Sequence, residues 1–143
     1  MKMMRRNRDG FTLVELMVVA IIVAILAAVA IPLMSANKKR AMASEGEAGL
    51  GSIRTALRAM YAESGAYNKD INGGTISTPC TVTNIPGVGA TDLDGKYFKS
   101  SDYSLHAAAP NTYTIQVVGN STSLVAGVTI TLDEGGNFSR IGL

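Results

Sequence analysis

The longest apolar run in the chain lies close to its N-terminus. Every residue from Leu16 to Ile31 is Leu, Met, Val, Ile or Ala, and the stretch 11–34 carries one charged side chain, that of Glu15. A helix of this stretch measures about 36 Å, enough to cross a hydrocarbon core of about 30 Å. The rest of the chain is too small and too polar to surround such a helix. The pattern therefore predicts one membrane-spanning helix.

The helix is predicted to continue through residues 35–64, because apolar residues recur there at helical spacing. They form one stripe, made of Leu50, Ile53, Leu57, Met60 and Tyr61. The charged residues off the stripe are expected to face solvent or other copies of the chain; they are Arg54, Arg58 and Glu63. Pro32 is expected to bend the helix, and Ser64-Gly65 to end it.

Three glycines, Gly46, Gly49 and Gly51, interrupt this second half of the helix. Each costs about 1 kcal/mol in a helix interior relative to Ala. Two interpretations stay open. The glycines permit close approach of helices in a packed assembly, or they mark a frayed or kinked stretch between two helices.

The remaining sequence changes from helical to strand-like patterning. Residues 65–101 are rich in Gly, Asn, Thr, Ser and Pro, which predicts an exposed loop with room for one short strand. In residues 102–143, apolar positions alternate as in antiparallel strands. The alternating sets are Tyr103, Leu105 and Ala107; Tyr113, Ile115 and Val117; Leu124, Ala126, Val128, Ile130 and Leu132; and, after a turn at 133–137, Phe138–Ile141. One apolar sheet face is expected to cover the helical stripe.

The fold class predicted from these patterns is α+β. A long N-terminal α-helix, membrane-spanning in its first half, packs its C-terminal half on a small antiparallel β-sheet. The chain has one cysteine, Cys80, so no internal disulfide can close the C-terminal region, and packing alone is expected to hold it.

Charge is concentrated before the apolar run. Four of the 13 basic residues and one of the 11 acidic residues lie in residues 1–10, so the remainder is close to neutral. Residues 65–143 contain few cations, namely Lys69, Lys96, Lys99 and Arg140. Binding to nucleic acid is therefore not indicated.

Catalytic and ligand-binding patterns are lacking in the sequence. His106 is the only histidine, and no catalytic triad, phosphate loop or metal-ligand spacing accompanies it. Asp92-Leu93-Asp94-Gly95 is interpreted as a turn rather than as part of a calcium loop. We expect no enzyme activity, no cofactor and no metal. Asn120-Ser121-Thr122 and Asn137-Phe138-Ser139 fit a short glycosylation pattern that occurs often by chance.

The start of the chain differs from an ordinary secretory signal, because its basic stretch ends at Gly10 and no A-x-A-like site follows the apolar run. This N-terminus resembles those of type IV pilins and of the pseudopilins of type II secretion. The resemblance rests on the residues Gly10, Phe11, Thr12, Leu13, Val14, Glu15 and Leu16 and on Pro32 at the far end of the run. Asp9 and Ala24 depart from the pattern, since the family usually has a basic residue and often Gly at these positions.

The resemblance implies processing and assembly residues. A prepilin peptidase is expected to remove residues 1–10 by cutting between Gly10 and Phe11, and to methylate the new amine of Phe11. Thr12, Glu15 and Pro32 are expected to serve assembly. Glu15 would pair with the Phe11 amine of a neighbouring subunit; alternatively, it only lies near the lipid headgroups, where a charge costs little.

The function expected from this resemblance is that of a structural subunit of a type IV pilus. The subunit would cross the cytoplasmic membrane once, with its head outside the cytoplasm, and then polymerise with other pilins into a cell-surface filament. An assembly platform and a cytoplasmic ATPase are its implied partners. The alternatives are a major pseudopilin of type II secretion and a membrane-tethered module that binds DNA or a surface ligand.

Overall fold

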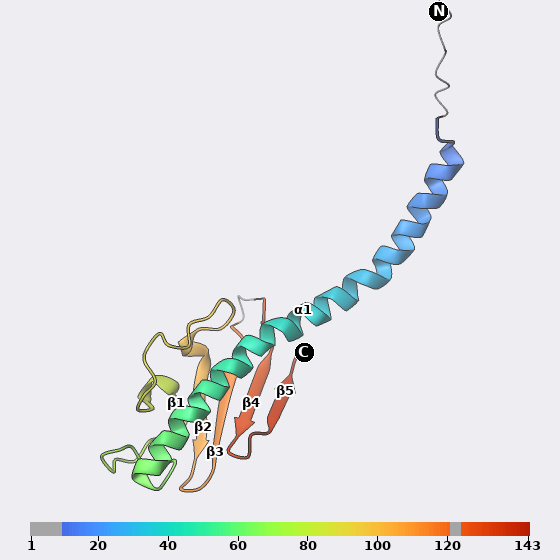
Figure 1. The fold of residues 1–143 in the computed structure, drawn as a ribbon. Coiled ribbons are helices and arrows are strands. Elements are labelled where there is room, and N and C mark those ends of the chain that lie inside the picture. Colours follow the sequence, from blue (N-terminus) through green and yellow to red (C-terminus); the bar gives the residue numbers. More distant parts are fainter. Residues whose placement is uncertain (1–9, 121–123) are drawn as a thin grey trace, which may run out of the picture. The chain divides into compact units, whose positions relative to one another are not determined.

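The computed structural model describes residues 10–120 and 124–143, and within them it contains one α-helix and a five-stranded antiparallel sheet (Figure 1). The helix is α1 (Leu13–Ser64), and the sheet has the order β1-β2-β3-β4-β5. The strands are β1 (Cys80–Thr81), β2 (Tyr103–Ala108), β3 (Tyr113–Val118), β4 (Thr129–Asp133) and β5 (Phe138–Ile141). Two single-turn 3-10 helices, Val82–Asn84 and Ser100–Asp102, lie in the connections. The predicted α+β class is confirmed.

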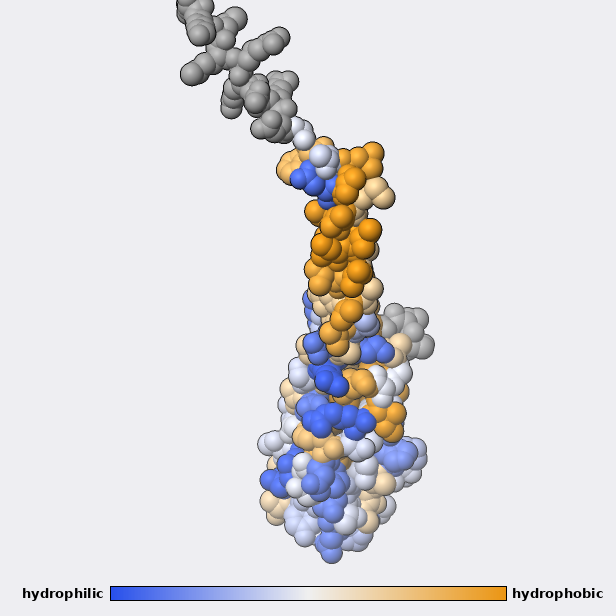
Figure 2. All heavy atoms as spheres, turned by 90° about the vertical axis from the view of Figure 1, so that its right-hand side faces the viewer, coloured by the Kyte–Doolittle hydropathy of each residue, from blue (hydrophilic) through white to orange (hydrophobic). Residues whose placement is uncertain are grey.

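The chain divides into two compact units, one ending at Ala36 and the other covering residues 37–143. In the first unit the side chains of α1 are solvent-exposed, and Figure 2 shows them as a nearly unbroken apolar surface. Among the described residues, α1 is the one helix long and apolar enough to cross a membrane. Pro32 lies inside α1, and the bend expected there stays a prediction.

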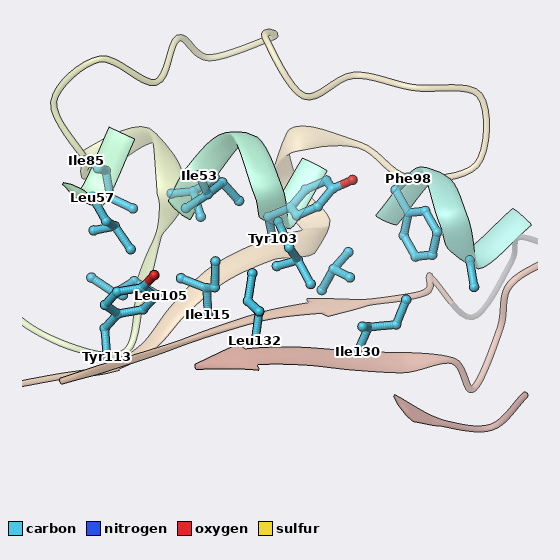
Figure 3. Packing of buried hydrophobic residues seen from close by; sticks show 14 of the residues in the cluster. Ile53, Leu57, Ile85, Phe98, Tyr103, Leu105, Tyr113, Ile115, Ile130 and Leu132 are labelled. Carbon is cyan, nitrogen blue, oxygen red and sulfur yellow. The ribbon is translucent and has the colours of Figure 1, made fainter. Parts of the chain in front are cut away.

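The second unit, which we call the head, has its core between α1 and one face of the sheet. The predicted stripe is confirmed for Leu50, Ile53, Leu57 and Met60, which are all buried, whereas its last member, Tyr61, is only partly buried. Figure 3 shows Ile53 and Leu57 of α1 facing Leu105 of β2, Ile115 of β3 and Leu132 of β4. The predicted end of the helix is also confirmed: Gly65 has a φ of 74°, and its N–H donates to the carbonyl of Tyr61.

Two of the predicted strand patterns are partly wrong. In β2, the pairing with β3 shifts between Leu105 and Ala107, so Ala107 is exposed and the bulge ends the simple alternation. The strand expected from Leu124 begins only at Thr129. Gly127 adopts a φ of 78° in a turn that precedes β4, and such a conformation interrupts an extended strand. Leu124, expected on the inner face, is exposed.

The segment 65–101 was predicted to be exposed, and part of it is instead core. Val82, Ile85 and Phe98 are fully buried against the helix and the sheet. Glu45 of α1 holds the far end of this segment, because its carboxylate accepts the backbone N–H groups of residues 96, 97 and 98 at 2.8–3.1 Å. Burial of Glu45 opposes ionisation, but these three donors and the nearby Lys99 outweigh it and lower the pKa of Glu45.

The glycines of α1 do not mark a frayed or kinked stretch, and the close approach of helices in an assembly stays a prediction. The helix is continuous through all three glycines. At two of them, the absence of a side chain leaves room for residues of the sheet and of the loop in the same head. A Cβ on Gly49 would overlap the hydroxyl of Tyr103, and one on Gly46 would lie 3.1 Å from the Phe98 ring. Gly51 has open space around it.

Arg54 does not face solvent as predicted. It is partly buried, and its guanidinium donates to the backbone carbonyl of Glu134 at 3.2 Å. The stripe pattern placed Arg54 off the apolar face, and its long side chain reaches the turn between β4 and β5. Arg58 and Glu63 are exposed, as predicted.

The C-terminal strand β5 is held by more than packing, which corrects the expectation drawn from the single cysteine. It pairs with β4 over four residues, and Arg140 forms an ion pair with Glu47 of α1. The turn before β5 is closed by Asp133, whose carboxylate accepts the backbone and side-chain N–H groups of Asn137. Hydrogen bonds and one ion pair therefore replace a disulfide.

Candidate functional site: the N-terminal end of α1

The predicted processing position lies just before α1, in a segment without regular secondary structure. Phe11 is 82% exposed, and nothing lies within 4 Å of a Cβ placed on Gly10. Exposed segments of this kind are the preferred sites of proteolytic cleavage. Residues 1–9 of the predicted leader lie outside the described residues, and Asp9 is among them.

Thr12 and Glu15 form a reciprocal pair that the sequence interpretation missed. The carboxylate Oε2 of Glu15 accepts both the backbone N–H and the hydroxyl of Thr12, each at 2.8 Å. In return, the Thr12 hydroxyl oxygen accepts the backbone N–H of Glu15 at 3.2 Å. This is a capping box, which satisfies backbone donors that a helix start leaves without partners. The Thr-x-x-Glu spacing was the signal for it in the sequence.

The capping box gives Glu15 a partner within its own chain. Both bonds from Thr12 reach Oε2, and within the described residues no hydrogen bond reaches Oε1. A carboxylate can accept about four hydrogen bonds, so the box leaves acceptor capacity for a second donor. Glu15 lines an open hollow together with apolar side chains, those of Phe11, Val14, Leu16, Val18 and Val19. The site thus combines one negative charge with an apolar wall.

The apolar surface continues along the first unit of α1. Its large side chains are about half to three-quarters exposed, from 49% for Val18 to 73% for Leu13. Leaving so much apolar surface in water is unfavourable, and patches of this size mark surfaces that contact membranes or other proteins. Pro32, the third predicted assembly residue, lies 17 positions after Glu15 along the same helix.

The other sequence candidates do not form a reactive centre in the described part of the chain. His106 is exposed on β2, and the Asp92 carboxylate accepts the N–H of Gly89 in a turn. No group of three or more metal-ligating side chains occurs among the described residues. Cys80 is half-buried, which raises the pKa of its thiol and makes it less reactive. Asn137 donates to Asp133, whereas Ser121 and Thr122 of the other glycosylation pattern lie outside the described residues.

The N-terminal pattern matches a known family model and the whole chain has similar relatives. Residues 5–31 match the prokaryotic N-terminal methylation motif. The chain is 30% identical over 127 residues to the type IV major fimbrial protein FimA of Dichelobacter nodosus, covering 87% of this chain and 79% of that protein. It is also 31% identical to the fimbrial protein EcpC of Eikenella corrodens, covering 88% of this chain and 72% of that protein.

The chain belongs to the type IV pilin family. A shorter stretch of 67 residues is 42% identical to the type IV major pilin PilA of Myxococcus xanthus. This alignment covers 47% of this chain and 30% of that protein's length. Among solved structures, this pilin resembles the non-core minor pilin PilV of Neisseria meningitidis with a TM-score of 0.50. That match covers 75% of this chain and 90% of PilV at 19% identity, so it supports the fold alone.

Family membership explains why the first unit of this pilin is so apolar and so exposed. Pilin subunits anchor in a membrane and later reside in a filament at the cell surface, and both environments cover an apolar helix. The head has a core of its own, because most of its large apolar residues are packed between α1 and the sheet.

Proposed function

We propose that this pilin is a structural subunit that polymerises into a type IV pilus through the apolar first unit of α1. The observation that carries the proposal is an exposed apolar helix with one charge, in a chain whose relatives over most of its length are fimbrial proteins. Before assembly, lipid covers this surface; in the filament, the same surface of other copies covers it. The relatives named as pilins and fimbrial proteins favour a pilus over a secretion pseudopilus.

Assembly is preceded by removal of the leader. A prepilin peptidase cuts between Gly10 and Phe11 and methylates the amine that the cut releases on Phe11. The match to the N-terminal methylation motif and the exposure of Phe11 support this step. All atoms of the capping box follow the cut, so the mature chain begins at Phe11, one residue before the capping residue Thr12.

Glu15 then joins two subunits. Its Oε1 accepts a hydrogen bond from the cationic Phe11 amine of a neighbouring subunit, while Oε2 keeps its bonds to Thr12. Such a charge pair is stronger in an apolar filament core than in water, because the dielectric is low and water is excluded. One charged pair on an otherwise apolar helix also fixes axial register, because any other register leaves both charges unpaired.

The head stays outside the cytoplasm during these steps, so the leader and the Phe11 end of α1 face the cytoplasmic side. The cut precedes assembly by the pilus platform, and a cytoplasmic ATPase drives extraction of the subunit from the membrane. The lipid contacts and the helix contacts of the apolar helix are of similar polarity, so exchanging one for the other supplies little free energy. Extraction therefore needs an external motor.

Electron microscopy of fibres sheared from the cells, combined with mass spectrometry, tests the proposal. The expected result is a filament made of this chain whose N-terminal peptide starts at Phe11 and is heavier by one methyl group. Fibres that lack the chain, or a mature chain that retains residues 1–10, would contradict it.

A further inference from the structure

Three consecutive cations, Lys38, Lys39 and Arg40, follow the apolar segment of α1; we call them the basic triplet. They belong to the helix, and Lys38 comes four residues after Met34, which is about one helical turn. The first buried residue of the head, Met42, follows two residues after Arg40. The basic triplet therefore occupies the short polar part of the helix between the apolar segment and the first buried residue of the head.

The basic triplet has no acidic partner in the described part of the chain. Lys38 and Arg40 are exposed, and Lys39 is partly exposed. From position 34 to position 44 the sequence contains no acidic residue, so no ion pair at i±3 or i±4 can form along the helix. The nearest acidic residues after it are already engaged: Glu45 with backbone N–H groups and Glu47 with Arg140.

The spacing of the basic triplet from Phe11 matches the thickness of a bilayer. Lys38 follows Phe11 by 27 residues, and a helix of that length rises about 40 Å, close to the 40–45 Å of a bilayer with its headgroups. A subunit whose Phe11 end lies at one surface thus brings the basic triplet to the phosphate level of the other. Lys and Arg have long apolar stems, which let their charges reach that level from any side of the helix.

We propose that the basic triplet binds the phosphate groups of anionic phospholipids on the leaflet that faces the head. The proposal rests on the membrane-anchored state given under Proposed function. Unpaired cations at the depth of the headgroups attract anionic lipid over zwitterionic lipid. A subunit that leaves the membrane for the filament must release these lipids, so the lipid charge of that leaflet sets how readily it is extracted.

Lipid selectivity around the full chain in bilayers tests the proposal. Spin-labelled phosphatidylglycerol and spin-labelled phosphatidylcholine are compared by electron paramagnetic resonance, which separates lipid held at the protein from bulk lipid. The triple variant K38Q/K39Q/R40Q removes the basic triplet. The control R58Q/K69Q/K96Q removes the same charge from exposed positions of the head. The basic residues of the leader are identical in all three proteins, so their contribution cancels.

The expected result is a roughly three- to tenfold preference for phosphatidylglycerol in the wild type. This preference should drop at least threefold in K38Q/K39Q/R40Q, be kept in the control, and weaken in high salt. The charge-conserving variant K38R/K39R/R40K should keep it. An equal preference in the wild type and K38Q/K39Q/R40Q overturns the proposal.

Two further outcomes distinguish a failure of this proposal from a failure of the membrane-anchored state on which it rests. If the basic triplet docks on acidic residues of a second copy, K38Q/K39Q/R40Q reduces self-association in a purely zwitterionic bilayer and leaves lipid selectivity unchanged; that result overturns the proposal. If neither lipid shows a protein-held fraction, the chain does not span the bilayer, and the membrane-anchored state itself is wrong.

Discussion

Thr12 and Glu15 close the start of α1 together: the Thr12 hydroxyl donates to the Glu15 carboxylate and accepts the Glu15 backbone N–H. The one charged side chain of the apolar segment is thus part of the helix start. Its cost in an apolar medium is reduced by two donors from its own chain before any neighbouring subunit arrives. The two residues therefore act as a unit, and their variants should be interpreted together.

Removing the Thr12 hydroxyl should loosen the first turn of α1. Thr12→Ala loses two of the three bonds of the capping box, and losses of this kind cost about 0.5–2 kcal/mol of helix stability. Amide hydrogen exchange of the full chain in detergent should be faster at residues 13–16. Thr12→Ser keeps a hydroxyl and serves as the control. Equal exchange in Thr12→Ala and the wild type would show that the box does not stabilise the helix.

Two variants of Glu15 separate capping from charge. Glu15→Gln keeps an amide oxygen that can accept from Thr12, whereas Glu15→Ala loses the box and the charge. Both should leave cleavage after Gly10 intact, and both should strongly reduce filament yield, because the neighbouring amine loses its anionic partner. Only Glu15→Ala should also speed hydrogen exchange at the helix start. Normal yield of filaments from Glu15→Gln would rule out the proposed charge pair between subunits.

Two glycines in the same part of α1 should respond in opposite directions to alanine. Gly49→Ala places a methyl group on the Tyr103 hydroxyl, and overpacking of this kind costs about 1–3 kcal/mol. Gly51→Ala meets open space and should raise stability by about 0.5–1 kcal/mol through helix propensity. Thermal unfolding of both variants measures the expected loss and gain of stability. Tyr103→Phe combined with Gly49→Ala should recover part of the loss; two variants with equal melting temperatures would contradict the packing described here.

The head should lose stability in acid through Glu45. Its pKa is lowered in the folded protein relative to an ordinary value of 4.5, because three backbone donors and Lys99 outweigh the effect of burial. The contribution of Glu45 to the stability of the folded head is therefore complete above pH 4.5 and is lost as the pH falls through the folded-state pKa. Melting temperatures measured from about pH 6 down to pH 3 should decline less steeply in Glu45→Gln. Parallel curves for the two proteins would show that Glu45 does not couple pH to folding.

Local patterns in the sequence were enough to predict the helix, its apolar stripe and its end. Leu50, Ile53 and Leu57 repeat at helical spacing, and Ser64-Gly65 supplies a stop, so no distant partner was needed. The capping box was also within reach, because Thr12 and Glu15 have its standard spacing. The interpretation of Glu15 instead looked for a partner in a neighbouring subunit or at the lipid headgroups, and so passed over Thr12 of the same chain.

Features that depend on residues far apart in the chain could not be predicted in this way. The role of Gly49 is set by Tyr103, and that of Arg54 by the carbonyl of Glu134, which lies 80 residues away. Likewise, nothing in a Gly- and Thr-rich stretch indicates that Ile85 and Phe98 are fully buried. A neighbouring subunit is a still more distant partner, so the pairing of Glu15 with another Phe11 stays a prediction.

The way Glu45 holds the loop at residues 96–98 determines which positions of this loop can change their amino acid. Its carboxylate bonds only to main-chain N–H groups, which every amino acid except proline supplies. Residue 96 is exposed and can therefore exchange its side chain without losing the anchor, whereas Tyr97 packs partly against the core and Phe98 is fully buried in it. A change of side chain at position 96 therefore leaves the attachment of this segment to α1 intact.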